Sequence, residues 1–239
     1  MKRHLIIGNG EIGKSLQAVL EADYAVDVRD RMFPDMKRKY HILHICYPFS
    51  DEFIRVTKAY QRIYDPELII IHSTVRPGTT RKLGRKYVYS PVRGTHPNLA
   101  LSIRTFVKYF GAEDPKKGKQ AIDIFRKLGV NCFVSNNPTE IEVLKILSTT
   151  AFGWNILFNQ EAKKICDKYR VNFDIAYTHE SHTYNAGYDE LDMGQFHKQV
   201  LKYMPGKIGG HCVLPNCQLI DSDITKYIIK KNHGRTIQK

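Results

Sequence analysis

A glycine-rich turn close to the N-terminus constrains the fold of this 239-residue chain more than any other feature. The turn, Gly8-Asn9-Gly10-Glu11-Ile12-Gly13, directly follows the apolar run 5–7 and precedes a helical pattern over 16–20. In such a strand–turn–helix unit the first glycine permits the turn, the second lets a pyrophosphate approach the backbone, and the third lets the helix pack on the strand. The pattern predicts a dinucleotide site at the helix N-terminus, formed by Gly8, Asn9, Gly10, Glu11, Ile12 and Gly13. The alternative is an ordinary turn between strand and helix.

An acidic residue at the end of the next strand would bind the ribose hydroxyls of such a dinucleotide. Residues 24–28 are predicted to form that strand, and Asp30 follows it. Asp27, within the strand, is the alternative acidic residue. Arg29 and Arg31 flank Asp30 and could instead hold a 2′-phosphate, so NAD and NADP both stay open.

Short apolar runs alternate with helical patterns through the first half of the chain. This alternation predicts an α/β fold, a Rossmann-like doubly wound and mostly parallel sheet covered by helices. The connection between the second and third strands is short and basic, contains Pro34, and leaves no room for a full helix. Further strands are expected at 42–46, 68–71, 87–89, 106–110 and 132–134, and helices at 51–63 and 116–128.

The character of the sequence changes at Pro138. From there to about Tyr169 no further proline appears and Gly153 is the only glycine. A proline at the start of a helix, followed by acidic residues, predicts one long central helix of about 45 Å. We therefore expect a dinucleotide-binding domain over 1–137 and a helical domain over 138–239, with further helices at 174–185, 193–204 and 219–231.

A second glycine-rich segment, near the C-terminal end, presents a cysteine as Gly209-Gly210-His211-Cys212. Glycines let the backbone approach a ligand closely, and a thiol becomes nucleophilic when cations or backbone dipoles favour its thiolate. Cys212 is therefore a candidate nucleophile, and an inert thiol is the alternative. His211, Cys212 and Cys217 lack the paired spacing of a zinc site, so no metal is predicted.

Composition limits the partners and the compartment that we expect. The net charge of +13 predicts attraction of anions such as nucleotides or sugar phosphates. The densest basic stretch begins at Lys226, but the sequence shows no ladder of aromatic and basic residues typical of a strand-binding groove, so a nucleic-acid partner is not expected. The five cysteines are irregularly spaced, which indicates reduced thiols and a cytoplasmic location. No apolar run reaches the length of a membrane span, so no membrane partner is expected.

Four blocks resemble the UDP-glucose and UDP-N-acetylmannosamine (GDP-mannose) dehydrogenase family. The glycine turn is the first, and the Gly-Gly-His-Cys loop is another. Residues 73–80, Ser-Thr-Val-Arg-Pro-Gly-Thr-Thr, are similar to the family's Ser-Thr-Val-x-Pro-Gly-Thr-Thr turn. Glu142-x-x-Lys145, with Asn155 and Glu161 downstream, is similar to the family's long central helix. The blocks cover most of the chain and follow the family's order.

The resemblance implies an NAD(P)-dependent dehydrogenase that oxidises an alcohol carbon of an anionic, sugar-like substrate such as a nucleotide sugar. Cys212 would trap the aldehyde as a thiohemiacetal that proceeds to a thioester, and Lys145 would stabilise an oxyanion. Thr149 and Asn216 take the positions of two further catalytic residues. The resemblance also implies a homodimer through the long helix, and cofactor contacts at Tyr47, Ser73, Thr74 and Val75.

Three departures from the family pattern keep other functions open. Asn216 stands where the family has an aspartate, and Val92 where it has a glutamate. Full-length relatives also continue into a UDP-binding domain, so the resemblance implies a shortened form. One alternative is a single-step hydroxyacid or sugar dehydrogenase that uses Lys145. The other is a catalytically degenerate module that binds a cofactor or a polyanion.

Overall fold

The computed structural model describes residues 2–30, 38–210 and 212–233. It divides into two compact units, Met1–Lys145 and Ile146–Lys239, called here the first and the second unit. The division falls inside one helix, whereas the domain boundary expected from the sequence lies at 137/138. That boundary stays a prediction.

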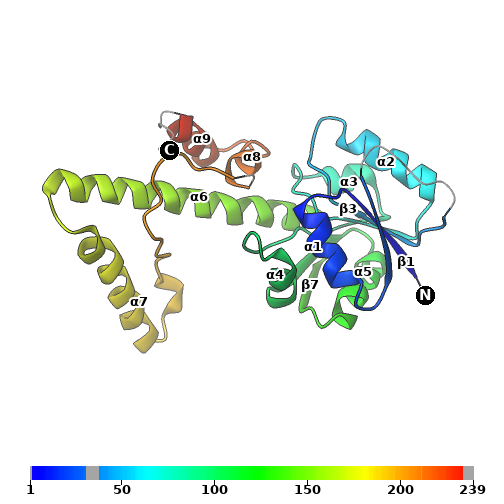
Figure 1. Ribbon diagram of the computed structural model, residues 1–239, viewed down its shortest axis with the longest axis horizontal. Helices are drawn as coiled ribbons and strands as arrows, with labels where there is room; N and C mark the ends of the chain where they lie inside the picture. Colours follow the sequence, from blue (N-terminus) through cyan, green and yellow to red (C-terminus); the bar gives the residue numbers. More distant parts are fainter. Residues whose placement is uncertain (1, 31–37, 211, 234–239) are drawn as a thin grey trace. The chain divides into compact units, whose positions relative to one another are not determined.

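The first unit is built on one seven-stranded sheet with the order β2-β1-β3-β4-β5-β6-β7 (Figure 1). Neighbouring strands pair in parallel except β5 and β6, which are antiparallel. The mostly parallel, Rossmann-like sheet is therefore confirmed. The strands are β1 (Arg3–Ile7), β2 (Ala25–Arg29), β3 (Ile42–Ile45), β4 (Leu68–Ile71), β5 (Tyr87–Tyr89), β6 (Lys108–Ala112) and β7 (Cys132–Ser135).

Helices cover both faces of this sheet, because the strands carry apolar side chains on both sides. One face packs against α1 (Glu11–Leu20), α4 (Leu99–Thr105) and α5 (Pro115–Lys127). The other packs against α2 (Phe53–Tyr64), α3 (Thr79–Leu83) and the start of the long helix. The sequence did not predict α3 and α4, which are five and seven residues long and too short for a periodic pattern.

The long helix is present as α6 (Pro138–Tyr169), 32 residues without interruption (Figure 1). Asn137 caps its first turn, since its Oδ1 accepts from the backbone N–H of Thr139 at 3.1 Å. By length and composition α6 is the one helix of the described ranges that could cross a membrane, and 39% of its most apolar stretch is buried. Asn159 and Gln160 are buried and donate to backbone carbonyls of the second unit, which is typical of the core helix of a helical domain.

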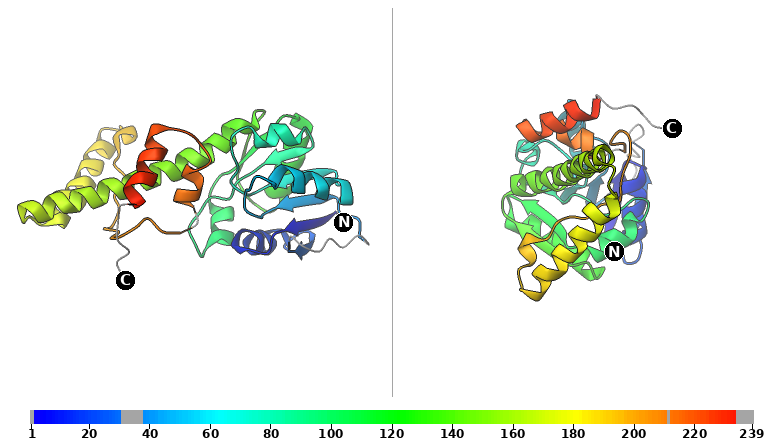
Figure 2. Two further views of the ribbon diagram at one scale, coloured as in Figure 1. Left: turned by 90° about the horizontal axis from the view of Figure 1, so that it is seen from above. Right: turned by 90° about the vertical axis from the view of Figure 1, so that its left-hand side faces the viewer.

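In the second unit, α8 (Val213–Cys217) and α9 (Asp223–His233) lie alongside α6 in Figures 1 and 2. Gly153 permits this packing, because a Cβ there would lie 2.5 Å from Cγ1 of Val213. The remaining helical elements are a π-helical stretch (Asp174–His179), α7 (Glu180–Glu190) and a short 3-10 turn (Gly194–Phe196).

Several predicted elements need correction. The helix expected at 193–204 is wrong: only the turn at Gly194–Phe196 forms, because Asn159 and Gln160 of α6 take backbone carbonyls of residues 201, 204 and 206 that a helix would use. The last helix begins at Asp223 rather than 219, where Ser222 accepts from the N–H of Thr225. The strand expected at 106–110 lies at 108–112. The connection predicted to be short, around Pro34, falls outside the described residues.

Candidate dinucleotide site and cysteine loop

The glycine turn has the geometry that the sequence predicts. Gly8 has φ +112°, and a Cβ there would lie 2.9 Å from the backbone of Cys46 and Tyr47. A Cβ on Gly13 would lie 1.9 Å from the carbonyl oxygen of Gly8, so helix α1 can pack on β1 only with glycine at this position. A Cβ on Gly10, in contrast, would meet no described atom within 4 Å. Gly10 therefore leaves open space at the N-terminus of α1, where a phosphate would approach.

The other predicted cofactor residues follow the carboxyl ends of neighbouring parallel strands, which share one edge of the sheet. Asp30 follows β2 and is exposed. Tyr47 follows β3, and Ser73, Thr74 and Val75 follow β4. Together with the glycine turn after β1, the structure brings these residues to the edge where ligands of doubly wound sheets bind.

Asp27, the alternative acidic residue, is hydrogen-bonded to neighbouring side chains. Its carboxylate accepts from the hydroxyl of Tyr40 at 2.9 Å and from Arg3 and Arg38 at 3.3 and 3.4 Å. Burial alone would raise the pKa of Asp27, but these hydrogen bonds bring it below its ordinary value. Asp27 is therefore bound to side chains of the sheet and the loop beside it, and Asp30 is the acidic residue that directly follows the strand.

Three of the residues predicted to contact the cofactor have buried side chains. The hydroxyl of Ser73 donates to the carbonyl of Tyr47 at 2.6 Å, which ties the loop after β4 to the loop after β3. The hydroxyl of Tyr47 pairs with Thr57 at 2.6 Å, and Val75 is fully buried in the core. Tyr47, Ser73 and Val75 thus shape the edge through their backbone, while Thr74 is half-buried.

Glu142 has a role that the sequence motif did not specify. Its buried carboxylate accepts from the backbone N–H groups of Gly78 and Thr80, at 2.5 and 2.8 Å, and from the hydroxyl of Thr80 at 2.6 Å. Burial raises the pKa of Glu142, while these hydrogen bonds act in the opposite direction. The turn over 73–80 and the first turns of α6 are therefore joined at Glu142. The signal was the Glu142-x-x-Lys145 pattern itself, which puts both residues on one face of the helix.

Lys145, one turn after Glu142, points to the loop after β5. Its Nζ donates to the carbonyl oxygen of Val92 at 2.9 Å. Ser90, Pro91 and Val92 form this loop and are buried. An ammonium placed by a backbone carbonyl is able to stabilise a developing oxyanion.

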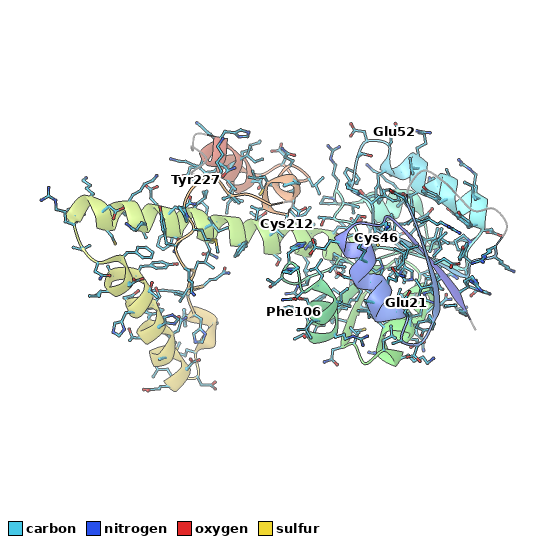
Figure 3. The ribbon with its side chains drawn as sticks, viewed as in Figure 1. Glu21, Cys46, Glu52, Phe106, Cys212 and Tyr227 are labelled. Atoms are coloured by element: carbon cyan, nitrogen blue, oxygen red, sulfur yellow. The ribbon has the colours of Figure 1, made fainter. Side chains whose placement is uncertain are left out.

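Cys212 lies in the second unit, at the end of the loop that leads into α8, and is labelled in Figure 3. It is partly exposed, whereas Cys217 is buried and burial raises the pKa of that thiol. The loop is fixed at its start by Asn232, whose Oδ1 accepts from the N–H of Ile208 at 2.6 Å. His211 lies outside the described residues.

The two polar candidates near this loop are brought together. Nδ2 of the buried Asn216 donates to the hydroxyl of Thr149 at 3.2 Å, and that hydroxyl donates to the carbonyl of Ile146 at 2.9 Å. An amide in this position holds Thr149 but cannot accept a proton. The structure thus groups Cys212, Thr149 and Asn216 in the second unit, and the glycine turn and Lys145 in the first. Within the described ranges no three His, Cys, Asp or Glu side chains gather as ligands for a metal ion.

The sheet order, the glycine turn and the long helix define the Rossmann-like dehydrogenase fold. Among solved structures, UDP-D-ManNAc dehydrogenase from Pyrococcus horikoshii matches with a TM-score of 0.76 and 18% identity, over 97% of this chain and 68% of that one. The 3-hydroxyisobutyrate dehydrogenase of Mycobacterium tuberculosis matches with a TM-score of 0.71 and 13% identity, over 98% and 93% of the two chains. These likenesses establish the fold.

The sequence places the chain more narrowly, as a relative of the UDP-sugar dehydrogenases. It is 26% identical over 158 residues to UDP-N-acetyl-D-mannosamine dehydrogenase of Methanococcus maripaludis, which covers 63% of this chain and 34% of that protein. The P. horikoshii enzyme of the same name is 24% identical over 161 residues, 61% of this chain and 35% of that protein. The match thus spans about a third of the length of these curated relatives. No family model matches the sequence.

Proposed function

We propose that this chain is a nicotinamide-dinucleotide-dependent oxidoreductase that oxidises an alcohol carbon of an anionic, sugar-like substrate, with a UDP-sugar as the favoured class. The observation that carries the proposal is the glycine turn. Gly8 and Gly13 are sterically required there, and Gly10 opens onto the N-terminus of α1. The names of the sequence relatives support the substrate class.

The residues present fit a dinucleotide. Backbone N–H groups at the start of α1 would hold the diphosphate, and the carboxylate of Asp30 would bind the adenosine ribose hydroxyls. That assignment favours NAD, while Arg29 beside Asp30 keeps NADP as the alternative. The nicotinamide ring accepts the hydride when it is bound.

For the chemistry, we assign Cys212 as the nucleophile after a first oxidation. Its thiolate would add to the aldehyde carbon and form a thiohemiacetal, the loss of a second hydride would give a thioester, and water would release the carboxylate and the thiol. Lys145 would stabilise the negative oxygen in these steps. Thr149 would contribute its hydroxyl, and Asn216 would hold Thr149 in place.

A single oxidation is the second candidate, and the side chains at two positions favour it. Val92 is buried and apolar, and the Asn216 amide is hydrogen-bonded to Thr149, so neither position supplies a base for the attack of water. In that reaction Lys145 would act alone on the substrate hydroxyl, and Cys212 would be incidental.

The stoichiometry of the product separates the two reactions. UDP-N-acetylmannosamine and UDP-glucose would each be incubated with the chain and excess NAD, and the NADH formed would be compared with the carboxylate or aldehyde recovered. Two NADH per carboxylate support the oxidation through Cys212, and one NADH per aldehyde supports the single step. C212S is expected to stop at the aldehyde, while C132S, in which the other partly exposed cysteine is changed, should match the parent chain. If the chain binds NAD but yields no product from any sugar nucleotide, the degenerate cofactor-binding module replaces both.

We also propose that the chain forms a homodimer through α6 in the cytoplasm. Leu147, Trp154 and Phe158 are 56%, 43% and 58% exposed and are spaced seven and four residues apart, on one face of the helix. Light scattering at micromolar concentration should give twice the 27.6 kDa mass of the chain, and a monomer would contradict the proposal.

A further inference from the structure

An unusual polar row crosses the interior of the first unit. His4 of β1, His44 of β3 and His72 after β4 lie side by side on the face of the sheet that α5 covers, and each is at most 1% exposed. Lys108 of β6 continues the row and is 4% exposed. The surrounding positions on this face are apolar. Buried polar groups are normally hydrogen-bonded, and within the described structure every ring nitrogen of the row has a partner except Nε2 of His4 at its end.

The hydrogen bonds of the three histidines run in one direction. Nδ1 of His72 lies 2.8 Å from the carbonyl oxygen of Ser90, which only accepts, so this nitrogen carries the hydrogen. Nε2 of His72 therefore accepts from Nδ1 of His44 at 3.0 Å, and Nε2 of His44 accepts from Nδ1 of His4 at 2.9 Å. All three rings are held neutral, because burial lowers the pKa of His4 to about 4 and the pKa values of His44 and His72 well below the ordinary value.

Lys108 ends the row at the loop after β5. Its Nζ donates to the carbonyl oxygens of Ser90 and Pro91, at 3.2 and 3.5 Å, and stands over the rings of Phe110 and Phe125 at 5.6 and 5.1 Å. Burial is the main cause that lowers the pKa of Lys108 to about 7. The titratable groups that face it within the described chain include no carboxylate: they are His72 after β4, His44 of β3, Cys46 after β3, Cys132 of β7 and Lys145 of α6.

One short loop is therefore bound by two ammonium groups. Lys108 donates hydrogen bonds to the carbonyls of Ser90 and Pro91, and Lys145 donates one to the carbonyl of Val92, the next residue. The N–H of Ser90 is fixed in turn by the carbonyl of Ile71 at 2.8 Å. The path of the loop decides where the Val92 carbonyl lies, and that carbonyl orients the Lys145 ammonium.

We propose that Lys108 is a positioning residue: its buried ammonium, braced by the histidine row, fixes the Ser90–Val92 loop and so holds Lys145 in its working orientation. The proposal rests on the proposed function for the role of Lys145 in catalysis. When Lys108 loses its proton near neutral pH, the two charge-assisted hydrogen bonds weaken and the loop is released. Catalysis should then decline on the alkaline side of pH 7, by a route that does not involve the cofactor site.

The test compares the parent chain with K108M, which keeps the length of the side chain without its charge, and with K119M, a matched change on the exposed surface of α5. The parent chain and K119M should show a decline of kcat/KM around pH 7. K108M should lack that decline and have kcat/KM lower by about tenfold or more at pH 6, with the dissociation constant of NAD unchanged. An unaltered pH profile in K108M would overturn the proposal.

A second measurement does not need activity. The lysines would be labelled biosynthetically with ¹³C and ¹⁵N, and the Cε and Nζ signals of Lys108 and Lys145 followed from pH 5 to 10. The Lys145 signal should show a step near pH 7 that coincides with the titration of Lys108 and is absent from K108M. A Lys145 signal that does not change as Lys108 titrates would contradict the positioning role, even if the chain oxidises no substrate. Turnover without that coupling would leave the proposed function intact and remove this inference.

Discussion

Replacing Glu142 by alanine should destabilise the first unit more than any other single carboxylate removal on α6. The carboxylate accepts hydrogen bonds from three donors, the N–H groups of Gly78 and Thr80 and the Thr80 hydroxyl. A buried donor that loses its partner costs about 1 to 3 kcal/mol. Removing the carboxylate also removes its own desolvation cost, so we expect a net loss of about 3 kcal/mol in the free energy of unfolding.

Urea unfolding, followed by labelling of the buried thiol of Cys46, would measure this loss. At a slope of about 2 to 3 kcal/mol per molar urea, the midpoint should fall by roughly 1 M. E142Q should lose less stability than E142A, because it keeps one acceptor oxygen. It should still be less stable than the parent chain, because its amide N–H groups face the donors. E161A is the matched control: this glutamate lies exposed on the same helix, and its loss should change stability by less than about 0.5 kcal/mol. If the urea midpoint of E142A equals that of E161A, the hydrogen bonds between Glu142 and the turn over 73–80 do not stabilise the first unit.

Two further predictions concern the packing of α6 and the histidine row. G153A should lose about 1 to 3 kcal/mol of stability, because the added methyl group overlaps Val213. G187A on α7 should be neutral or stabilising, because a Cβ there meets nothing within 4 Å. Circular dichroism melts of the two variants measure the difference. The neutral His4 should make the chain sensitive to acid, because its pKa of about 4 lies below the 6.5 of the unfolded chain and protons then favour unfolding as the pH falls between these values. At about 1.4 kcal/mol per pKa unit, His4 accounts for about 3 kcal/mol between pH 7 and pH 4. Urea midpoints across this range should therefore fall less steeply in H4F, and an equal slope would show that His4 does not titrate in this way.

The sequence predicts the parts of the fold in which one local pattern decides the structure. The glycine turn, the apolar strands and the proline-free stretch over 138–169 each have a strong period or a strong boundary, and the corresponding elements form. The expected helix at 193–204 does not form, because Asn159 and Gln160, more than thirty residues earlier in the chain, bind the carbonyls of that segment. No local pattern carries information about such a long-range partner.

The same limit applies to the candidate site. The motifs identified Lys145, Cys212 and the glycine turn as residues of interest, and the structure places each on the expected element. The hydrogen bonds of Glu142 are made with residues about sixty positions earlier in the chain. Those of Lys108 are made with loop carbonyls that the antiparallel pairing of β5 and β6 brings close to it. A lysine inside a short β-rich run gives no sign in the sequence that it is buried.

Calorimetric titration of the whole chain with NAD, and in parallel with NADP, tests whether the glycine turn is a cofactor site. We expect saturable binding of one dinucleotide per chain, with NAD favoured through Asp30. G10A should fold like the parent chain, since Gly10 has φ −79° and space for a Cβ, yet bind at least about tenfold more weakly because the methyl group occupies the approach of the diphosphate. A folded parent chain that binds neither dinucleotide, or a G10A variant that binds as tightly as the parent, would contradict the assignment of the glycine turn as a cofactor site.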